Sequence, residues 1–315
     1  MPVPPHVFVL DGERLRYGQL MRDRQSYRFR SFRQAALPRD AFQSGPLGGP
    51  LRDPAAFQSL VGGLVREVPG GLKEASLVVP DAWLRVAFTE ISDVPKTAEQ
   101  RDEVLRWKLR RLVPFRVDEL RVDAVEVTPL PVQEEPRRLL LGFAVEQLLA
   151  QIEESFAAQG VRLGQISNVS LSLLPALAPL TAPEARGTFT GLVVADAGGY
   201  TLILARGKEP VLHRYKAFTG DMPEGARSSS VVRDLKLTHN FLDEHFAGAA
   251  LGRLLLVSPP ELEPVWLDRL EEGFGRAAQP LDGRHLPPVR SDEGKAPPWR
   301  ELAPMLGAAR QEVTA

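Results

Sequence analysis

The chain opens with three apolar or alternating runs that are separated by short turn-forming segments. They lie within residues 6–37, HVFVLDGERLRYGQLMRDRQSYRFRSFRQAAL. In the third run Tyr27 and Phe29 alternate with arginines, as expected of a strand with one buried and one solvent-facing side. Short turns between such runs favour antiparallel pairing. The pattern predicts a three-stranded β-meander at the start of the chain.

The same order of elements recurs in residues 191–218, GLVVADAGGYTLILARGKEPVLHRYKAF. Two apolar runs flank a pair of glycines and a third extended run follows, which again predicts a three-stranded meander. Both meanders place an Asp and a Gly at their first turn, at positions 11 and 12 and at positions 196 and 198. This repetition predicts a duplicated architecture.

Helical and extended patterns alternate through the rest of the chain. Asp53 before Pro54 is a typical helix start, Thr97 and Gln100 can form a capping box, and Gly160 suits a helix end. Apolar spacing predicts helices at 54–68, 97–113, 144–159, 227–246, 261–274 and 299–313. Apolar runs predict strands at 75–80, 83–88, 120–130, 138–143 and 253–257. The elements between the meanders predict a small α+β insertion in the first half.

The second predicted helix has an aromatic residue away from its apolar stripe. Leu105, Leu109 and Leu112 form the stripe, whereas Trp107 points almost the other way and lies between two arginines on the helical wheel. An aromatic residue with arginines suits a partner surface. Packing of Trp107 against a neighbouring subdomain is an equally good interpretation.

Composition narrows the possible functions. The chain has 315 residues, 43% of them hydrophobic, enough for a sizeable core. Its 39 Lys and Arg nearly balance its 40 Asp and Glu, so no overall field favours nucleic acid. The absence of cysteine excludes disulfides, thiol nucleophiles and cysteine-bound zinc. The five histidines show no metal-ligand or triad spacing.

The apolar stretches also bear on location. The N-terminal sequence lacks the features of a secretion signal, and stretches such as 139–145 are far shorter than the roughly 18 residues of a membrane span. We therefore expect a soluble, cytoplasmic protein that binds no nucleic acid and does not insert into a membrane. Asn168 begins a formal glycosylation sequon, which we discount in that compartment.

The turn of the second meander has the pattern Asp-x-Gly-x-x-Thr. Asp196 at a strand end can orient the water shell of a magnesium ion, while Gly198 and Gly199 let backbone N–H groups approach a phosphate. The hydroxyl of Thr201 adds a donor. The pattern predicts a nucleotide-phosphate hairpin, although a pair of glycines also simply makes a tight turn.

The order of elements resembles the actin-like ATPase superfamily and, within it, the PilM family of cytoplasmic proteins in type IV pilus machines. The resemblance covers nearly the whole chain. It is carried by SLVVPDAWLRVAFTEI, WKLRRLVPFRVDELRVDAVEV, LLLGFAVEQLLAQIEESFAAQGVRLGQIS, VVADAGGYTLIL and APMLGAARQ, in this order.

The resemblance implies an α/β protein with a duplicated, ribonuclease-H-like actin fold and an inserted α+β subdomain. It places residues 1–73, 164–186 and 297–315 in the first half, residues 74–163 in the insertion and residues 187–296 in the second half.

Two of the family's three nucleotide elements depart from its pattern. The first phosphate loop reads Leu-Asp11-Gly12-Glu13-Arg, without hydroxyl residues and with a glutamate whose charge repels phosphate. The glycine-rich adenosine loop is replaced by Ser258-Pro-Pro-Glu261, which suits a helix start capped by Ser258. Arg214 also resembles a family position, with structural pairing as the alternative. We expect nucleotide binding and hydrolysis to be weak or absent.

By resemblance, the chain is expected to be a scaffold that binds the cytoplasmic N-terminal tail of a PilN-like inner-membrane protein. Other platform proteins and motor ATPases are further expected partners, and they would hold the chain at the inner membrane. The family places the tail between the first half and the insertion, where Trp83, Phe88 and Trp107 are candidate contacts.

The resemblance also leaves alternatives. The first is an active, ATP-dependent switch or ATPase of the same machine, with ATP and magnesium as cofactors. A sugar or acyl kinase of the superfamily needs a substrate base and an intact adenosine loop, which the sequence does not supply. A GspL-like protein would carry a membrane span, and an FtsA-like protein a terminal basic amphipathic helix, which residues 310–315 do not provide.

Overall fold

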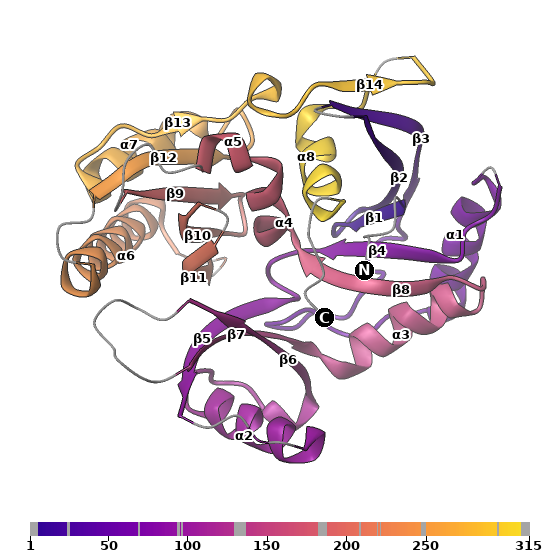
Figure 1. Ribbon diagram of the computed structural model, residues 1–315, viewed down its shortest axis with the longest axis horizontal. Helices are drawn as coiled ribbons and strands as arrows, with labels where there is room; N and C mark the ends of the chain where they lie inside the picture. Colours follow the sequence, from indigo (N-terminus) through magenta and orange to yellow (C-terminus); the bar gives the residue numbers. More distant parts are fainter. Residues whose placement is uncertain are drawn as a thin grey trace.

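The computed structural model contains two large sheets and a smaller third sheet (Figure 1). It describes residues 6–23, 26–68, 70–92, 95, 97–128, 137–181, 188–207, 209–218, 220, 222–246, 250–294 and 296–309.

The first sheet has the strand order β14-β3-β2-β1-β4-β8, the second β11-β10-β9-β12-β13, and the third β5-β7-β6. The strands are β1 (His6–Leu10), β2 (Arg14–Asp23), β3 (Ser26–Ala36), β4 (Glu74–Val79), β5 (Arg85–Ile91), β6 (Leu120–Val127), β7 (Arg137–Val145), β8 (Arg162–Asn168), β9 (Thr188–Ala195), β10 (Gly199–Arg206), β11 (Glu209–Ala217), β12 (Ala250–Val257), β13 (Gln279–Pro280) and β14 (Val289–Ser291). The helices are α1 (Pro54–Arg66), α2 (Ala98–Arg110), α3 (Glu146–Ala157), α4 (Val169–Ala176), α5 (Ala178–Thr181), α6 (Glu224–His245), α7 (Glu263–Phe274) and α8 (Trp299–Ala308), with 3₁₀ turns at Val117–Glu119 and Gly283–His285.

The two large sheets repeat one topology. In the first, β1 pairs antiparallel with β2, β2 antiparallel with β3, and β1 parallel with β4. In the second, β9, β10, β11 and β12 pair in the same way. Parallel pairing requires a crossover connection, which α1 supplies in the first half and α6 in the second. The predicted duplication of two meander-led halves is confirmed.

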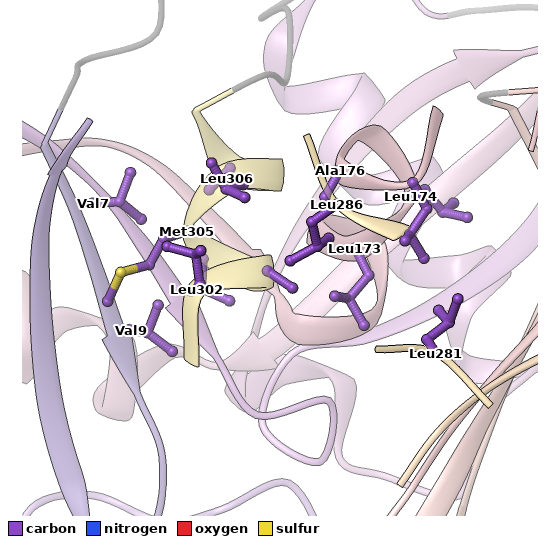
Figure 2. Packing of buried hydrophobic residues seen from close by; sticks show 14 of the residues in the cluster. Val7, Val9, Leu173, Leu174, Ala176, Leu281, Leu286, Leu302, Met305 and Leu306 are labelled. Atoms are coloured by element: carbon purple, nitrogen blue, oxygen red, sulfur yellow. The ribbon is translucent and has the colours of Figure 1, made fainter. Parts of the chain in front are cut away.

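Each large sheet is covered on both faces because its strands alternate between two cores. On β1, Val7 and Val9 face α4 and α8, whereas Phe8 and Leu10 face α1 and α3. The same alternation on β10 divides its residues between the α4–α8 core and the core beneath α6 and α7. The helices α4 and α8 therefore lie between the two sheets and join the halves through one core (Figure 1, Figure 2).

Close contact between α4 and α8 needs a glycine. A Cβ atom at Gly307 would overlap the backbone of Ser172 on α4. Figure 2 shows Leu302, Met305 and Leu306 of α8 between the β1 residues and Leu173 of α4. This packing fixes the position of the first turn of α4, which carries part of the site described below.

The third sheet belongs to the insertion. It contains β5, β6 and β7, and α2 covers it through the buried side chains Leu105 and Leu109. The predicted block 74–163 also includes β4 and α3. The structure places both with the first half, because β4 pairs with β1 and β8 while α3 packs against α1. In the same sheet, β14 pairs with β3, although residues 289–291 fall in the predicted second half.

Several predicted element ends differ from the structure. The predicted strand at 83–88 runs from Arg85 to Ile91, so Trp83 lies in the turn before it. α2 ends at Arg110, and Leu112 is therefore 48% exposed rather than part of the apolar stripe. Ser258 does not cap α7, which begins only at Glu263. Before it, the Pro259 carbonyl accepts backbone hydrogen bonds in a separate turn. Residues 129–130 of the predicted strand and 310–313 of the last predicted helix lie outside the described residues.

Within the described ranges, none of the helices combines the length and apolar composition that a bilayer span requires.

Candidate functional site at the junction of the halves

The turn between β9 and β10 is closed by the side chain of Asp196. Its carboxylate Oδ1 accepts hydrogen bonds from the backbone N–H groups of Gly198 at 2.7 Å and Gly199 at 2.9 Å. The Asp196 N–H also donates to the Gly199 carbonyl at 3.0 Å. The two N–H groups that a phosphate would need are therefore already bonded to Asp196.

The other predicted phosphate ligands of this hairpin face the protein. A Cβ atom at Gly199 would overlap the carbonyl oxygen of Lys216, so this glycine is required for the close pairing of β10 with β11. Thr201 is only 1% exposed. Asp196 and Gly198 remain exposed, and they are the part of the pattern that a ligand from solvent can reach.

The turn between β1 and β2 has the same local geometry. The Asp11 Oδ1 accepts hydrogen bonds from the N–H groups of Glu13 at 2.8 Å and Arg14 at 2.7 Å. Asp11 also forms an ion pair, with Arg16, whose Nε lies 3.6 Å from Glu301 on α8, whereas no described residue forms an ion pair with Asp196. No atom of the described residues lies within 4 Å of a Cβ atom added at Gly12.

The loop that replaces the glycine-rich element is held by the last helix. The guanidinium of Arg300 on α8 donates to the Ser258 carbonyl at 2.8 and 3.2 Å and pairs with Glu263 at 2.7 Å. Ser258 itself is buried. The loop before α7 is thus tied to α8 through polar contacts.

Within range of the charge of Asp196 lies a buried polar cluster that the sequence patterns did not predict. Asp81 follows β4, Ser170 lies in the first turn of α4, and His213 lies on β11 of the second half. The Ser170 hydroxyl donates to Asp81 and lies 3.0 Å from His213 Nε2. The Ser170 N–H also donates to Asp81 at 3.3 Å. The cluster therefore links the two halves.

Burial sets the protonation of this cluster. It raises the pKa of Asp81 to about 7, an effect that the negative charge of Asp196 reinforces and the hydrogen bonds from Ser170 oppose. Burial also lowers the pKa of His213 to about 3, so its imidazole is neutral. Because His213 Nδ1 has no hydrogen-bond partner among the described residues, the tautomer protonated at Nε2, which donates to Ser170, is the favoured one.

The cluster does not have the arrangement of a nucleophilic triad. In a triad the histidine lies between the acid and the nucleophile, whereas here Ser170 bonds directly to both Asp81 and His213. Ser170 is also fully buried, so no substrate reaches its hydroxyl. What the arrangement supplies is a polar connection between the halves with one carboxylate that titrates near neutral pH.

Asn168, the asparagine of the formal glycosylation sequon, has a structural role beside the cluster. Its side chain is fully buried, caps α4 by accepting the Leu171 N–H at 2.9 Å, and donates to the Leu84 carbonyl at 3.0 Å.

The sequence contained only a partial signal for the cluster of Asp81, Ser170 and His213. Asp81 directly follows a buried apolar strand, but Ser170 and His213 have no local pattern that pairs them with it.

Comparison with known proteins agrees with the topology. No family model matches the sequence, and no curated protein matches it. A solved chain of the PilM-PilN type IV pilus biogenesis complex superposes with a TM-score of 0.70, covering 98% of this chain and 97% of its own length at 14% identity. This chain has the actin-like ATPase fold.

Two more distant solved structures also align over nearly their whole length. One is the cytoplasmic domain of EpsL from the type II secretion system of Vibrio cholerae, 9% identical, with a TM-score of 0.48 and coverage of 98% of this chain and 95% of that one. The other is a Bacteroides thetaiotaomicron protein with an actin-like ATPase fold, 8% identical, with a TM-score of 0.47 and 96% coverage of both chains.

Within this actin-like fold, the three predicted partner residues lie apart. The Trp83 ring packs at a tilt against that of Phe42, with a centroid distance of 4.4 Å, at the junction of the first half and the insertion. Phe88 lies beneath the guanidinium of Arg138, 4.2 Å from its ring centroid, where the insertion contacts the second half. Trp107 lies on the exposed side of α2.

The remaining polar candidates have structural partners. Arg214 donates to the Asp234 carbonyl at 3.2 Å and to the Thr238 hydroxyl at 3.0 Å, both on α6, so it positions that helix. Across the described part of the chain, no three His, Asp or Glu side chains come together as a metal site would require.

Proposed function

We propose that this chain is an actin-like scaffold of a type IV pilus assembly platform and binds the cytoplasmic N-terminal tail of a PilN-like inner-membrane protein. The observation that carries the proposal is the match, over nearly the whole length of both chains, to a chain of the PilM-PilN complex. The chain would lie in the cytoplasm, held at the inner membrane by this partner, with other platform proteins and motor ATPases as further contacts.

The junction between the first half and the insertion supports a tail site there. The loop over residues 42–51 contributes Leu51 to the core of the first half and Leu47 to the core of the insertion. The Trp83 ring covers this loop, with Gly48 directly beneath it. Trp83 is half-buried and therefore keeps part of its surface for a peptide.

A scaffold that does not depend on hydrolysis is supported by the turns. Asp11 and Asp196 each bond the N–H groups of their own turn, and Asp11 is in addition paired with Arg16. Binding a nucleotide phosphate would require both turns to give up these bonds. Each hydrogen bond to a charged group contributes about 1.5 to 3 kcal/mol, so the rearrangement competes with phosphate binding.

Titration with a PilN-type tail peptide tests the scaffold proposal. We expect binding by the wild-type protein and binding weakened about tenfold or more by Trp83→Ala, because interface tryptophans contribute strongly. Trp107→Ala is the matched control and should bind normally. Thermal melts of both variants exclude unfolding as the cause. The proposal is wrong if the peptide fails to bind wild-type protein.

The alternative, an ATP-dependent switch, is favoured by one observation: Asp196 is exposed and has no ion-pair partner among the described residues. Such a carboxylate can hold the water shell of magnesium. Titration calorimetry with Mg-ATP separates the two functions. Micromolar binding that Asp196→Ala abolishes would support the switch, whereas no heat up to millimolar ATP would support the scaffold.

A further inference from the structure

We infer that the surface formed by Trp107 and Lys108 of α2 and by Arg111, which caps the C-terminal end of that helix, docks an acidic segment of a partner protein; this surface is called here the α2 patch. This surface is separate from the proposed tail site beside Trp83. The inference concerns a second partner and does not depend on the tail site.

The fold does not need Trp107 for its own packing. α2 contacts the insertion through Leu105 and Leu109, which are 5% and 0% exposed. Trp107 is 46% exposed. A large aromatic side chain left exposed on an otherwise polar helix is typical of an interaction surface.

Two cations lie against the Trp107 ring. The guanidinium carbon of Arg111 is 4.4 Å from the ring centroid, and the Lys108 ammonium is 5.4 Å from it. The helical period of 3.6 residues places the three side chains within an arc of about 100°. A guanidinium stacked on a ring is held in one plane, and its fork of N–H groups matches a carboxylate.

The charges of this face are not balanced within the described part of the chain. Residues 106–116 include five basic residues and no acidic one: Arg106, Lys108, Arg110, Arg111 and Arg116. Three of the five are paired, with Asp102, Asp118 and Glu119. Lys108 and Arg111 form no ion pair with a described residue. Glu103, one turn before Trp107, is the acidic side chain that the helical period places beside the ring.

The size of the α2 patch selects a protein over a membrane. Adsorption to anionic lipid typically uses clusters of roughly four to eight basic residues, whereas two free cations are available here. An aromatic ring flanked by Arg and Lys instead resembles a hot spot for a short segment with two carboxylates around an apolar anchor. The partner is therefore expected to present acidic side chains next to an aliphatic or aromatic one.

Selection from a random displayed peptide library tests the inference. The library is selected on wild-type protein and depleted on the double variant Trp107→Ala/Arg111→Glu, which removes peptides that bind elsewhere, including at the tail site. Recovered peptides are then measured by fluorescence anisotropy against each single variant. Arg233→Glu on α6, an exposed residue away from α2, is the matched charge-reversal control.

We expect the recovered peptides to be acidic and to lose about tenfold or more in affinity with Trp107→Ala and with Arg111→Glu, while Arg233→Glu binds normally. Recovery of no patch-dependent peptide, or of neutral or basic ones, would overturn the inference. So would patch-dependent sedimentation with phosphatidylglycerol vesicles in the absence of such peptides. The double variant should still bind the PilN-type tail peptide, so failure of the tail proposal is recognised separately.

Discussion

The first turns of the two meanders share the same backbone hydrogen bonds to an aspartate, but the electrostatic surroundings of the two aspartates differ. In both, an aspartate accepts two N–H groups of its own turn, at 2.7 to 2.9 Å. Asp11 is then paired with Arg16 and through it approaches α8, whereas Asp196 stays exposed beside the buried Asp81. The duplication thus preserved a turn shape, and among the described residues the aspartate of the first turn is held in an ion pair whereas that of the second is not.

The largest expected difference between the turns concerns their glycines. Gly199→Ala places a methyl group against the Lys216 carbonyl and should destabilise the protein by about 2 to 4 kcal/mol, because backbone cannot yield as a side chain does. Gly12→Ala enters open space and should change stability by less than about 0.5 kcal/mol. Urea unfolding of both variants measures this. Equal effects would mean that the second turn tolerates rearrangement, which would favour the ATP-switch alternative.

The sequence predicted what local patterns determine. The meanders follow from alternation and turn residues, and the first helix begins at Pro54 after Asp53, whose carboxylate caps it as expected. The turns show the limit, since Asp-x-Gly-x-x-Thr fits a phosphate cradle and a turn closed by its own aspartate equally well. Which one forms depends on whether the Asp196 carboxylate takes the N–H groups, a competition between side chain and ligand that residue identities leave undecided.

The buried cluster shows why the rest was not predictable. Ser170 is 89 residues from Asp81 and 43 from His213 along the chain. Asp81, Ser170 and His213 are common residue types, and no local sequence pattern marks them as a cluster. Ser170 stands out in the sequence only because it ends a sequon. Their proximity follows from the packing of α4 between the sheets, which is a long-range consequence of the duplication.

The second prediction concerns pH, because the two buried groups of the cluster titrate in opposite directions. The pKa of Asp81 is raised from 3.8 to about 7, so its contribution is full below pH 4 and is lost as pH rises towards 7. The pKa of His213 is lowered from 6.5 to about 3, so its contribution is full above pH 6.5 and is lost as pH falls. Between about pH 4 and 6.5 the two effects offset each other in the wild-type protein.

Replacing either Asp81 or His213 makes the pH dependence of the remaining group measurable. Relative to wild type, Asp81→Asn should gain stability as pH rises from 4 to 6.5, and His213→Gln should lose it, each with a slope of up to about 1.4 kcal/mol per pH unit. Urea unfolding across this range gives both curves. Parallel curves for the two variants and wild type would show that the cluster does not titrate as described.

A smaller effect distinguishes the two aspartates of the turns. Asp11→Asn keeps the turn acceptor but removes the charge paired with Arg16, whose side chain is only 13% exposed. We expect a loss of about 1 to 2 kcal/mol from Asp11→Asn and a change within about 0.5 kcal/mol from Asp196→Asn. Unfolding at pH 7 compares them directly. If the variants were equally stable, the ion pair would not be what separates the turns.

The smallest effect tests whether Asp196 acts on Asp81 through its charge. Because that charge raises the pKa of Asp81, Asp196→Asn should lower it, by less than about one pH unit. In the His213→Gln background, where Asp81 dominates the pH dependence, the fall in stability should then level off at lower pH. Asp11→Asn is the charge-matched control: it should lower stability at every pH but leave unchanged the pH at which the curve levels off. If both variants shifted the stability curve equally along the pH axis, the cause would be the change in the net charge of the protein. A local effect of Asp196 on Asp81 requires that the two variants differ.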